Sequence, residues 1–149
     1  ASDVYKRQSL MRRQGAQQAM EDAGIVFNDK LYGLSNYDFE SAYHAVNSLL
    51  ARRAEFTALF AMSDVIAFGA IRALVSAGLR VPEDVSVIGF DGITMSRYCV
   101  PVMTTIVQPS EQIALQSIEL LVRQIEHGSP AQTVTLQPEL QQGESVRAI

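Results

Sequence analysis

The sequence predicts an α/β fold with a mostly parallel sheet and helices on both faces, and three observations support this prediction. Segments with helical spacing of apolar residues alternate along the chain with short apolar runs that are typical of strands. Residues 56–91 have the order strand, helix, strand, which at this length forms a parallel pair with a right-handed crossover. The composition, 48% hydrophobic and 19% charged over 149 residues, is ordinary for one soluble globular domain with a real core.

The first eight residues, ASDVYKRQ, lack the apolar periodicity that begins soon afterwards. The run DVYKRQ looks like a transposon-adapter sequence that was read through in translation. We therefore expect residues 1–8 to be a non-native segment and exclude them from the fold prediction, with native sequence beginning near Ser9 and the true protein extending further upstream. The alternative is a harmless polar N-terminus.

Two helices and one short strand are predicted in the first third of the chain. Residues 9–23 have apolar side chains at helical spacing, and Gly24, a typical helix end, follows them. Residues 31–34 are a short strand candidate, with a polar loop at 36–38 at its carboxyl end. Residues 41–52 place apolar side chains on one face, which predicts a second helix.

The central strand–helix–strand unit begins with a short apolar run at 58–62, the pattern of a strand that is covered on both faces. Ser63 and Asp64 follow directly, and both are residue types preferred at helix N-termini. The apolar residues of 65–77 have close to helical spacing. Gly78 then stands where such a helix needs a left-handed C-terminal residue.

The second strand of this unit is predicted at 85–90, after a turn at 81–84. It ends at Asp91, so its carboxyl end lies beside that of the first strand, where Ser63 and Asp64 stand. In open α/β sheets this edge is where ligands bind. These polar residues are therefore candidates for a binding site.

The last third continues the alternation. A loop at 92–100 leads to a predicted strand at 103–107, and Ser110 is a plausible N-cap for a long amphipathic helix over 110–127. A last short strand is predicted at 133–136, before a polar tail. The apolar positions of the long helix are Ile113, Leu115, Ile118, Leu121, Val122 and Ile125.

The charge balance limits the partners of this chain. With 16 acidic and 12 basic residues the net charge is −4, so nothing favours binding to DNA or to an anionic membrane by this part alone. No apolar run reaches the roughly 18 residues that a membrane helix needs, and the N-terminus has no secretory signal pattern. We expect a soluble domain without a membrane partner.

The motifs of catalytic and metal-binding proteins are missing from the sequence. A single cysteine, Cys99, excludes an internal disulfide and a cysteine-based zinc site. His44 and His127 lie far apart without further clustered ligands, so we expect surface positions for both. No nucleophile elbow, Walker loop or dinucleotide-binding motif occurs. We therefore predict no catalytic residue, no metal and no cofactor, and not an enzyme.

Polar residues at the predicted strand ends carry the remaining functional signal. Taken singly, Ser63 and Asp64 could be helix caps only, and Asp91 could be a turn residue. Gln108 could be solvated, and Tyr37 could be a surface ring. Together, hydroxyl, carboxylate, amide and aromatic groups at one sheet edge are what a neutral polyhydroxylated ligand requires.

Three segments closely resemble the lactose-repressor (LacI/GalR) family of bacterial transcription regulators. They are SDVIAFGA at 63–70, GLRVPEDVSVIGFD at 78–91 and PVMTTIVQP at 101–109. The RRQG of 12–15 and the closing segment 138–145 fit as well, so the resemblance covers about residues 9–146.

The resemblance implies a helix-turn-helix head, a hinge helix and a two-subdomain, periplasmic-binding-protein-like core that closes on a small effector. Residues 9–107 would be the C-terminal subdomain of that core, truncated at its N-terminus, where one central strand would be missing. Residues 108–132 would hold a helix of the N-terminal subdomain, and 133–149 a return strand and tail. DNA would be bound only through the head, in the cytoplasm.

The same resemblance assigns ligand-binding roles to five positions. Arg12 would bind effector hydroxyl groups through its guanidinium fork, and Tyr37 would line the pocket with its ring. Asp91 matches the pocket carboxylate, and Gln108 would contact ligand or hinge at the crossover between subdomains. Ser63 stands where the family often has asparagine, which removes a bidentate amide and puts the recognised hydroxyl pattern in doubt.

Members of the family form dimers through the C-terminal subdomain, so the resemblance also implies a homodimer. Core packing is the alternative role for the residues concerned. The interface candidates are Phe68, Ile71, Tyr98, Cys99 and Val100.

We expect this chain to be the effector-sensing domain of a sugar-responsive repressor. The alternative is a periplasmic sugar-binding protein of an ABC transporter, which has the same fold. A third class, an α/β enzyme or receiver domain, would use Asp64 and Asp91 but lacks the lysine that such pockets pair with aspartate. Upstream sequence separates the first two, because a repressor carries a helix-turn-helix and a receptor a signal peptide.

Overall fold

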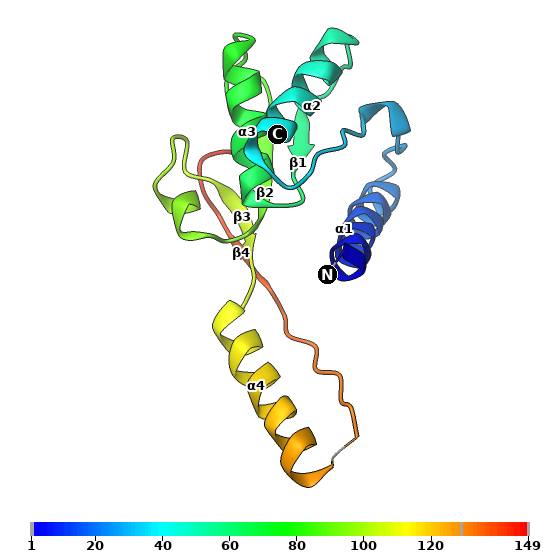
Figure 1. The fold of residues 1–149 in the computed structure, drawn as a ribbon. Helices are drawn as coiled ribbons and strands as arrows, with labels where there is room; N and C mark the ends of the chain where they lie inside the picture. Colours follow the sequence, from blue (N-terminus) through cyan, green and yellow to red (C-terminus); the bar gives the residue numbers. More distant parts are fainter. Residues whose placement is uncertain (1, 129, 149) are drawn as a thin grey trace.

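The computed structural model describes residues 2–128 and 130–148 and shows a mixed α/β fold (Figure 1). Its four-stranded sheet has the order β1-β2-β3-β4, in which the first three strands are parallel and β4 is antiparallel to β3. The predicted class is thus confirmed. The longer elements are α1 (Ser2–Asp22), α2 (Phe39–Ala51), β1 (Ala58–Phe60), α3 (Asp64–Ser76), β2 (Ser86–Asp91), β3 (Thr104–Val107), α4 (Ser110–His127) and β4 (Glu139–Gln141).

The predicted strand–helix–strand unit forms as β1, α3 and β2. Ser63 is the N-cap of α3, and its hydroxyl oxygen accepts a hydrogen bond from the Ile66 N–H. Gly78 follows the helix in a left-handed conformation with φ +81°. Both local predictions are therefore confirmed, and β1 and β2 pair in parallel as expected.

The coverage predicted for the first strand is wrong. Ala58 and Phe60 are exposed, and β1 is three residues long. Within the described part of the chain β1 pairs with β2 only, so it is an edge strand. An apolar run reports that a strand can be buried, whereas burial itself depends on a neighbour on each side.

The core lies between the sheet and the paired helices α2 and α3. Gly69 of α3 allows this approach, because a Cβ there would lie 2.4 Å from the Phe39 carbonyl oxygen and 2.8 Å from the Ala42 Cβ. On the other face of β2, the Arg12 guanidinium of α1 lies 3.8 Å from the centroid of the Phe90 ring. Since Phe90 alternates with the α3-facing Gly89, α1 approaches the sheet from the side opposite α3. The buried apolar residues are Val46, Ala61, Ala67, Ala70, Ala73, Leu74, Val85, Val87 and Met103.

Two predicted short strands do not form. At 31–34 the chain completes a 3₁₀ turn (η1, Asp29–Leu31) and then continues irregularly, with Leu34 80% exposed. At 133–136 the chain runs back alongside α4, where it meets no strand (Figure 1). β4 forms later, where Glu139 comes opposite Val107 of β3. Both runs have β-forming residues, but a strand needs a partner with an open edge.

The long helix α4 projects away from the sheet (Figure 1). The predicted cap is wrong by one residue, because Pro109 occupies the N-cap position and no side chain caps the helix. Gly128 ends it with φ +62°. Its predicted apolar residues are exposed, by between 40% for Ile113 and 74% for Ile125.

At both ends of the chain, more residues take part in the fold than the sequence predicted. The helical backbone of α1 begins at Ser2 rather than near Ser9, so it includes most of the segment expected to be non-native. The polar tail is tied into the sheet by Ser145, which is fully buried. Its hydroxyl donates to the Val87 carbonyl (2.6 Å) and accepts from the Thr104 N–H (2.8 Å), so it joins β2 to β3.

Candidate functional site

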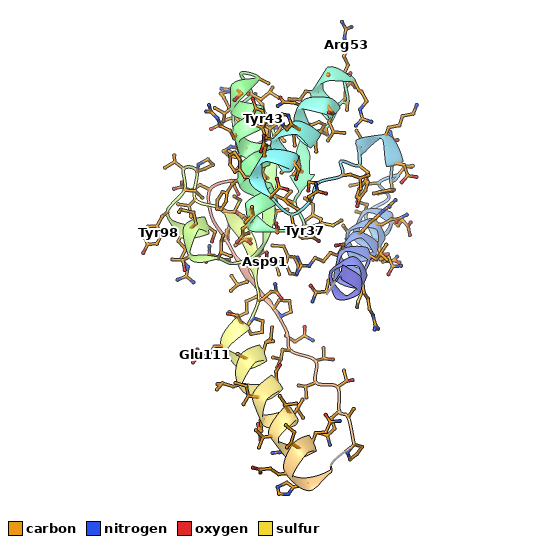
Figure 2. The ribbon with its side chains drawn as sticks, in the orientation of Figure 1. Tyr37, Tyr43, Arg53, Asp91, Tyr98 and Glu111 are labelled. Carbon is orange, nitrogen blue, oxygen red and sulfur yellow. The ribbon has the colours of Figure 1, made fainter. Side chains whose placement is uncertain are left out.

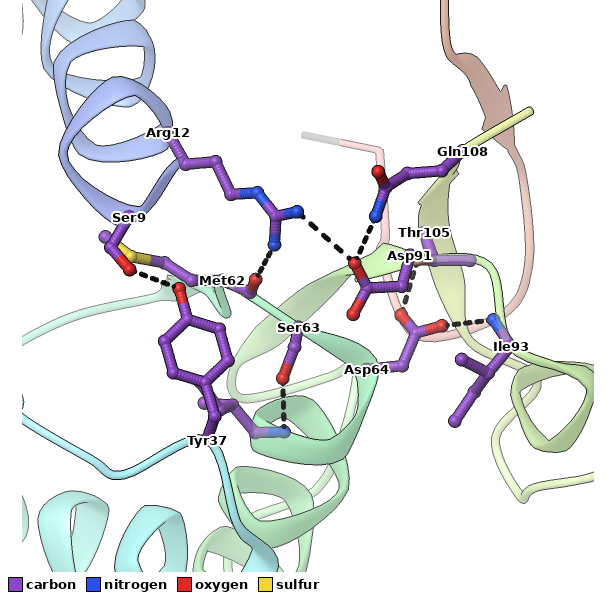
Figure 3. Close-up of polar contacts among 11 residues, drawn as sticks. Ser9, Arg12, Tyr37, Met62, Ser63, Asp64, Asp91, Ile93, Thr105 and Gln108 are labelled. Carbon is purple, nitrogen blue, oxygen red and sulfur yellow. Dashed lines mark hydrogen bonds and ion pairs between the residues drawn. The ribbon is translucent and has the colours of Figure 1, made fainter. Parts of the chain in front are cut away.

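Asp91 is the centre of the predicted site. It ends β2 with φ +121°, a conformation that is rare for a residue with a side chain. Its Oδ1 accepts hydrogen bonds from Gln108 Nε2 at 2.6 Å and from Arg12 Nη2 at 3.4 Å (Figure 3). The Gln108 backbone N–H also donates to the Asp91 carbonyl at 3.1 Å. Three residues from different parts of the chain thus meet at the carboxyl end of the sheet.

Arg12 is held in place by three groups. Its Nη1 atom donates a hydrogen bond to the carbonyl of Met62, two residues after the end of β1. The guanidinium plane also lies over Phe90, a cation–π contact. Only 13% of the Arg12 side chain is exposed, so its guanidinium group has little freedom to move. A preorganised guanidinium beside a carboxylate suits recognition of vicinal hydroxyl groups.

The electrostatic environment of Asp91 acts in two directions. Burial, the largest effect, raises the pKa of this carboxyl above its ordinary value of 3.8. The positive charge of Arg12 and the bond from Gln108 act to lower it, and the nearby negative charge of Asp64 acts to raise it. The net effect is a raised pKa, with burial as its main cause. A group that covers Asp91 further would therefore disfavour its ionised form.

Ser63 and Tyr37 lie near this cluster but make other bonds (Figure 3). Ser63 is 4% exposed, and its oxygen accepts from the Ile66 N–H as the helix cap. Its O–H proton is not used in that bond and can still donate. The Tyr37 hydroxyl bonds with Ser9 Oγ at 2.6 Å, which links the loop to α1 one turn before Arg12. The structure thus brings together Arg12, Asp91 and Gln108, with the other two beside them.

One side chain of the site, Phe90, was not predicted as part of it. Phe90 supports Arg12, and the period-two alternation of β2 could have placed its ring on the α1 side. Asp64 was predicted as a candidate at this edge of the sheet, with a helix cap as the alternative, and its buried carboxylate bonds instead with Thr105 Oγ1 and the Ile93 N–H. No local pattern predicts these two bonds, because both partners come from distant sequence.

A cavity of about 370 Å³ lies next to this site but is distinct from it. It follows the outer side of β1, between α1, the loop after it and α2. Of the five predicted ligand-binding residues, Tyr37 alone lines it. Its lining is mainly apolar, which suits buried side chains better than a polyhydroxylated ligand.

The predicted interface residues fall into two groups. Tyr98 and Val100 are 78% and 94% exposed, and Figure 2 shows Tyr98 at the outer side of the loop after β2. Phe68 and Ile71 are partly buried against the core. Cys99 belongs to the second group, because it too is partly buried against the core. Its thiol donates to the carbonyls of Ser96 and Pro101. Burial raises the pKa of Cys99, so the thiol stays protonated and poorly reactive.

The described residues hold no group of three or more histidine, cysteine, aspartate or glutamate side chains arranged to bind a metal ion. Over the same residues, no helix is both long and apolar enough to cross a membrane.

Comparison with known proteins gives consistent matches. Residues 2–146 match the model of a periplasmic binding protein-like domain. The chain is 39% identical to the HTH-type transcriptional regulator MalR of Clostridium butyricum, over 92% of this chain and 41% of that protein. It is 35% identical to the HTH-type transcriptional repressor PurR of Histophilus somni, over 100% of this chain and 45% of PurR.

A solved structure also resembles this chain over most of its length. It is the complex of the transcriptional regulator CelR with cellobiose, with a TM-score of 0.87 and 33% identity. The match covers 91% of this chain and 42% of that one. The chain therefore spans less than half the length of each of these three relatives.

Proposed function

This chain belongs to the periplasmic-binding-protein-like domain family of LacI-type transcription regulators, and on this basis we propose that it senses a sugar-like effector for a bacterial repressor. Effector binding would favour closure of a two-subdomain core, and closure would change operator binding by a DNA-binding head elsewhere in the protein. The named relatives are regulators rather than transport receptors, which favours this function over the alternative of a periplasmic sugar-binding protein.

One observation carries the proposal: Arg12, Asp91 and Gln108 converge at the carboxyl end of the parallel strands. A carboxylate accepts hydrogen bonds from sugar hydroxyl groups, while guanidinium and amide groups donate to their oxygens. This is the edge at which open α/β sheets bind ligands. The cellobiose complex of CelR supports a sugar as the ligand class.

Further parts of the proposal concern the domains and partners. We assign residues 9–107 to the C-terminal subdomain, 108–132 to a helix of the N-terminal subdomain, and 133–149 to the return strand and tail. Tyr98 and Val100, with their high exposure, support a homodimer contact on the loop after β2. DNA is assigned to the head only, and the repressor to the cytoplasm. No catalytic role is assigned.

Calorimetry of the full-length protein tests the proposal against a panel of ribose, cellobiose, other mono- and disaccharides and nucleosides. We expect at least one sugar to bind. Asp91→Ala and Arg12→Ala should each weaken its binding about tenfold to a hundredfold, because each removes a charged hydrogen-bonding group. The matched controls are Asp84→Ala, in the turn before β2, and Arg72→Ala, at an exposed position of α3, and both should leave affinity unchanged. If both site variants bind as wild type does, the pocket assignment is wrong.

A further inference from the structure

Asp64 is a fully buried carboxylate whose partners are a hydroxyl group and a backbone N–H. Its exposed fraction is 0%. Oδ1 accepts a hydrogen bond from the Thr105 hydroxyl of β3, and Oδ2 accepts from the Ile93 N–H at 2.8 Å (Figure 3). Burying a carboxylate is costly unless hydrogen bonds compensate it. A residue that only started α3 would not need to be buried there.

The fold leaves room for this side chain at one point of the sheet. Gly89 of β2 and Thr105 of β3 are register partners, and Asp64 lies over the pair. A Cβ at position 89 would lie 2.3 Å from Asp64 Oδ1, so any other residue would displace the carboxylate. Asp64 therefore reaches from α3 across β2 to β3 through a gap that glycine provides.

The bond to Ile93 fixes the segment that carries Asp91. Asp91 and Gly92 have φ values of +121° and +72°, and a Cβ on Gly92 would lie 2.7 Å from the Val107 Cγ2. The Gln108 N–H holds the Asp91 carbonyl on one side, and Asp64 holds the Ile93 N–H on the other. The unusual backbone of Asp91 is thus fixed at both ends.

We propose that Asp64 is a positioning residue for the effector site: it holds Ile93, and through it sets the direction of the Asp91 carboxylate, without contacting the effector. This inference rests on the proposed function. It separates two adjacent residues that the sequence presents alike, since Ser63 caps α3 and Asp64 orders the neighbouring loop. The negative charge of Asp64 also adds to burial in raising the pKa of Asp91, so the two carboxylates are coupled through space as well.

Hydrogen–deuterium exchange of the full-length protein tests the placement without any ligand. Asp64→Ala removes the acceptor of the Ile93 amide, so exchange in peptides covering 92–95 should rise about tenfold or more. Asp64→Asn can keep both bonds, because its oxygen accepts from Ile93 and its NH₂ group donates to the Thr105 oxygen. That variant should exchange as wild type does.

Peptides from β2 and β3 are the internal control for this measurement. An equal rise there and at 92–95 would mean that Asp64 only stabilises the fold, and would overturn the proposal. If Asp64→Ala does not fold, the pair Thr105→Val and Thr105→Ser replaces it. The valine variant, which lacks the hydroxyl, should raise exchange at 92–95, and equal behaviour of the pair would also overturn the proposal.

A double-mutant cycle tests the consequence for binding of the panel sugar that binds most tightly. Asp64→Ala should weaken this binding about tenfold in the wild-type background but very little in the Asp91→Ala background, because it acts through Asp91. Equal losses in both backgrounds would contradict a positioning role. The exchange measurement needs no sugar, so it decides the placement of Asp64 even if no panel sugar binds and the proposed function fails.

Discussion

At the residue scale, the buried carboxyl of Asp91 leads us to expect that the proposed effector binding depends on pH. Burial raises its pKa, so this group takes up a proton at a higher pH than an exposed aspartate does. A protonated carboxyl loses acceptor capacity for ligand hydroxyl groups. Sugar affinity of the full-length protein should therefore fall as pH is lowered, beginning above the ordinary pKa of 3.8. Calorimetry over a pH series measures this effect.

Asp91→Asn is the control for this prediction, because an amide does not titrate and its affinity should not change over the same pH range. A wild-type affinity that is equally flat would contradict the prediction. The effect on folding has the opposite sign. An acid whose pKa is raised in the folded state binds more protons there than in the unfolded state. Its contribution to the free energy of unfolding therefore falls as pH rises through that window.

At the element scale, the α2–α3 pair depends on the missing side chain at Gly69. Adding a methyl group there would place it within 2.4 Å of the Phe39 carbonyl and 2.8 Å of the Ala42 Cβ. We expect Gly69→Ala to lower the free energy of unfolding of the full-length protein by about 1–3 kcal/mol, because the helices must separate. Urea denaturation measures the change.

Gly15→Ala is the matched control within a helix. Gly15 lies inside α1, and beyond its chain neighbours and the nearby backbone of its own helix nothing lies within 4 Å of the position that its methyl group would take. The higher helix propensity of alanine should therefore leave stability equal or increase it by up to about 1 kcal/mol. A loss of stability in this control, or none in Gly69→Ala, would refute the steric explanation.

The apolar face of α4 gives a second prediction at this scale. Ile118 is 61% and Leu121 56% exposed in the structure. If this helix belongs to the N-terminal subdomain, both side chains are buried in the longer protein. Ile118→Gln and Leu121→Gln should then destabilise the full-length protein by about 1.5–3 kcal/mol each, but leave the 149-residue chain unchanged. Equal effects in the two proteins would refute this domain assignment.

At the scale of the whole molecule, the chain exposes more surface than a compact monomer does. Its accessible surface is 10374 Å², against about 7,500 Å² expected for a compact protein of 16.4 kDa. The excess comes with exposed apolar side chains on α4 and an edge strand beside an apolar cavity. The chain by itself therefore buries less apolar area than a compact protein of the same mass, and this burial is what stabilises a fold.

We accordingly expect the isolated 149-residue chain to unfold in a broad, weakly cooperative transition and to bind hydrophobic dyes before it unfolds. Differential scanning calorimetry and dye fluorescence measure the two effects. A sharp transition with equal calorimetric and van't Hoff enthalpies would show that the chain is a complete cooperative unit.

Several local features of this chain follow from its sequence alone. Caps and glycines set the ends of α3 through hydrogen bonds between neighbouring residues, as at Ser63 and Gly78. Alternating patterns predicted the α/β class, and the polar strand ends indicated the site near Asp91. The helix ends depend on residues a few positions apart, and the class depends on the order of such local segments, so the sequence contains both directly. The meeting of Asp91 with Arg12 and Gln108 depends on residues that are distant in the sequence.

Features that depend on distant partners were set by the tertiary structure. It left 31–34 and 133–136 without a strand to pair with, and made β1 an edge strand. It also placed Asp64 over the Gly89–Thr105 pair, where its carboxylate orders the loop after Asp91. Pairing and burial need a second surface, and in these cases that surface comes from residues that no local pattern identifies.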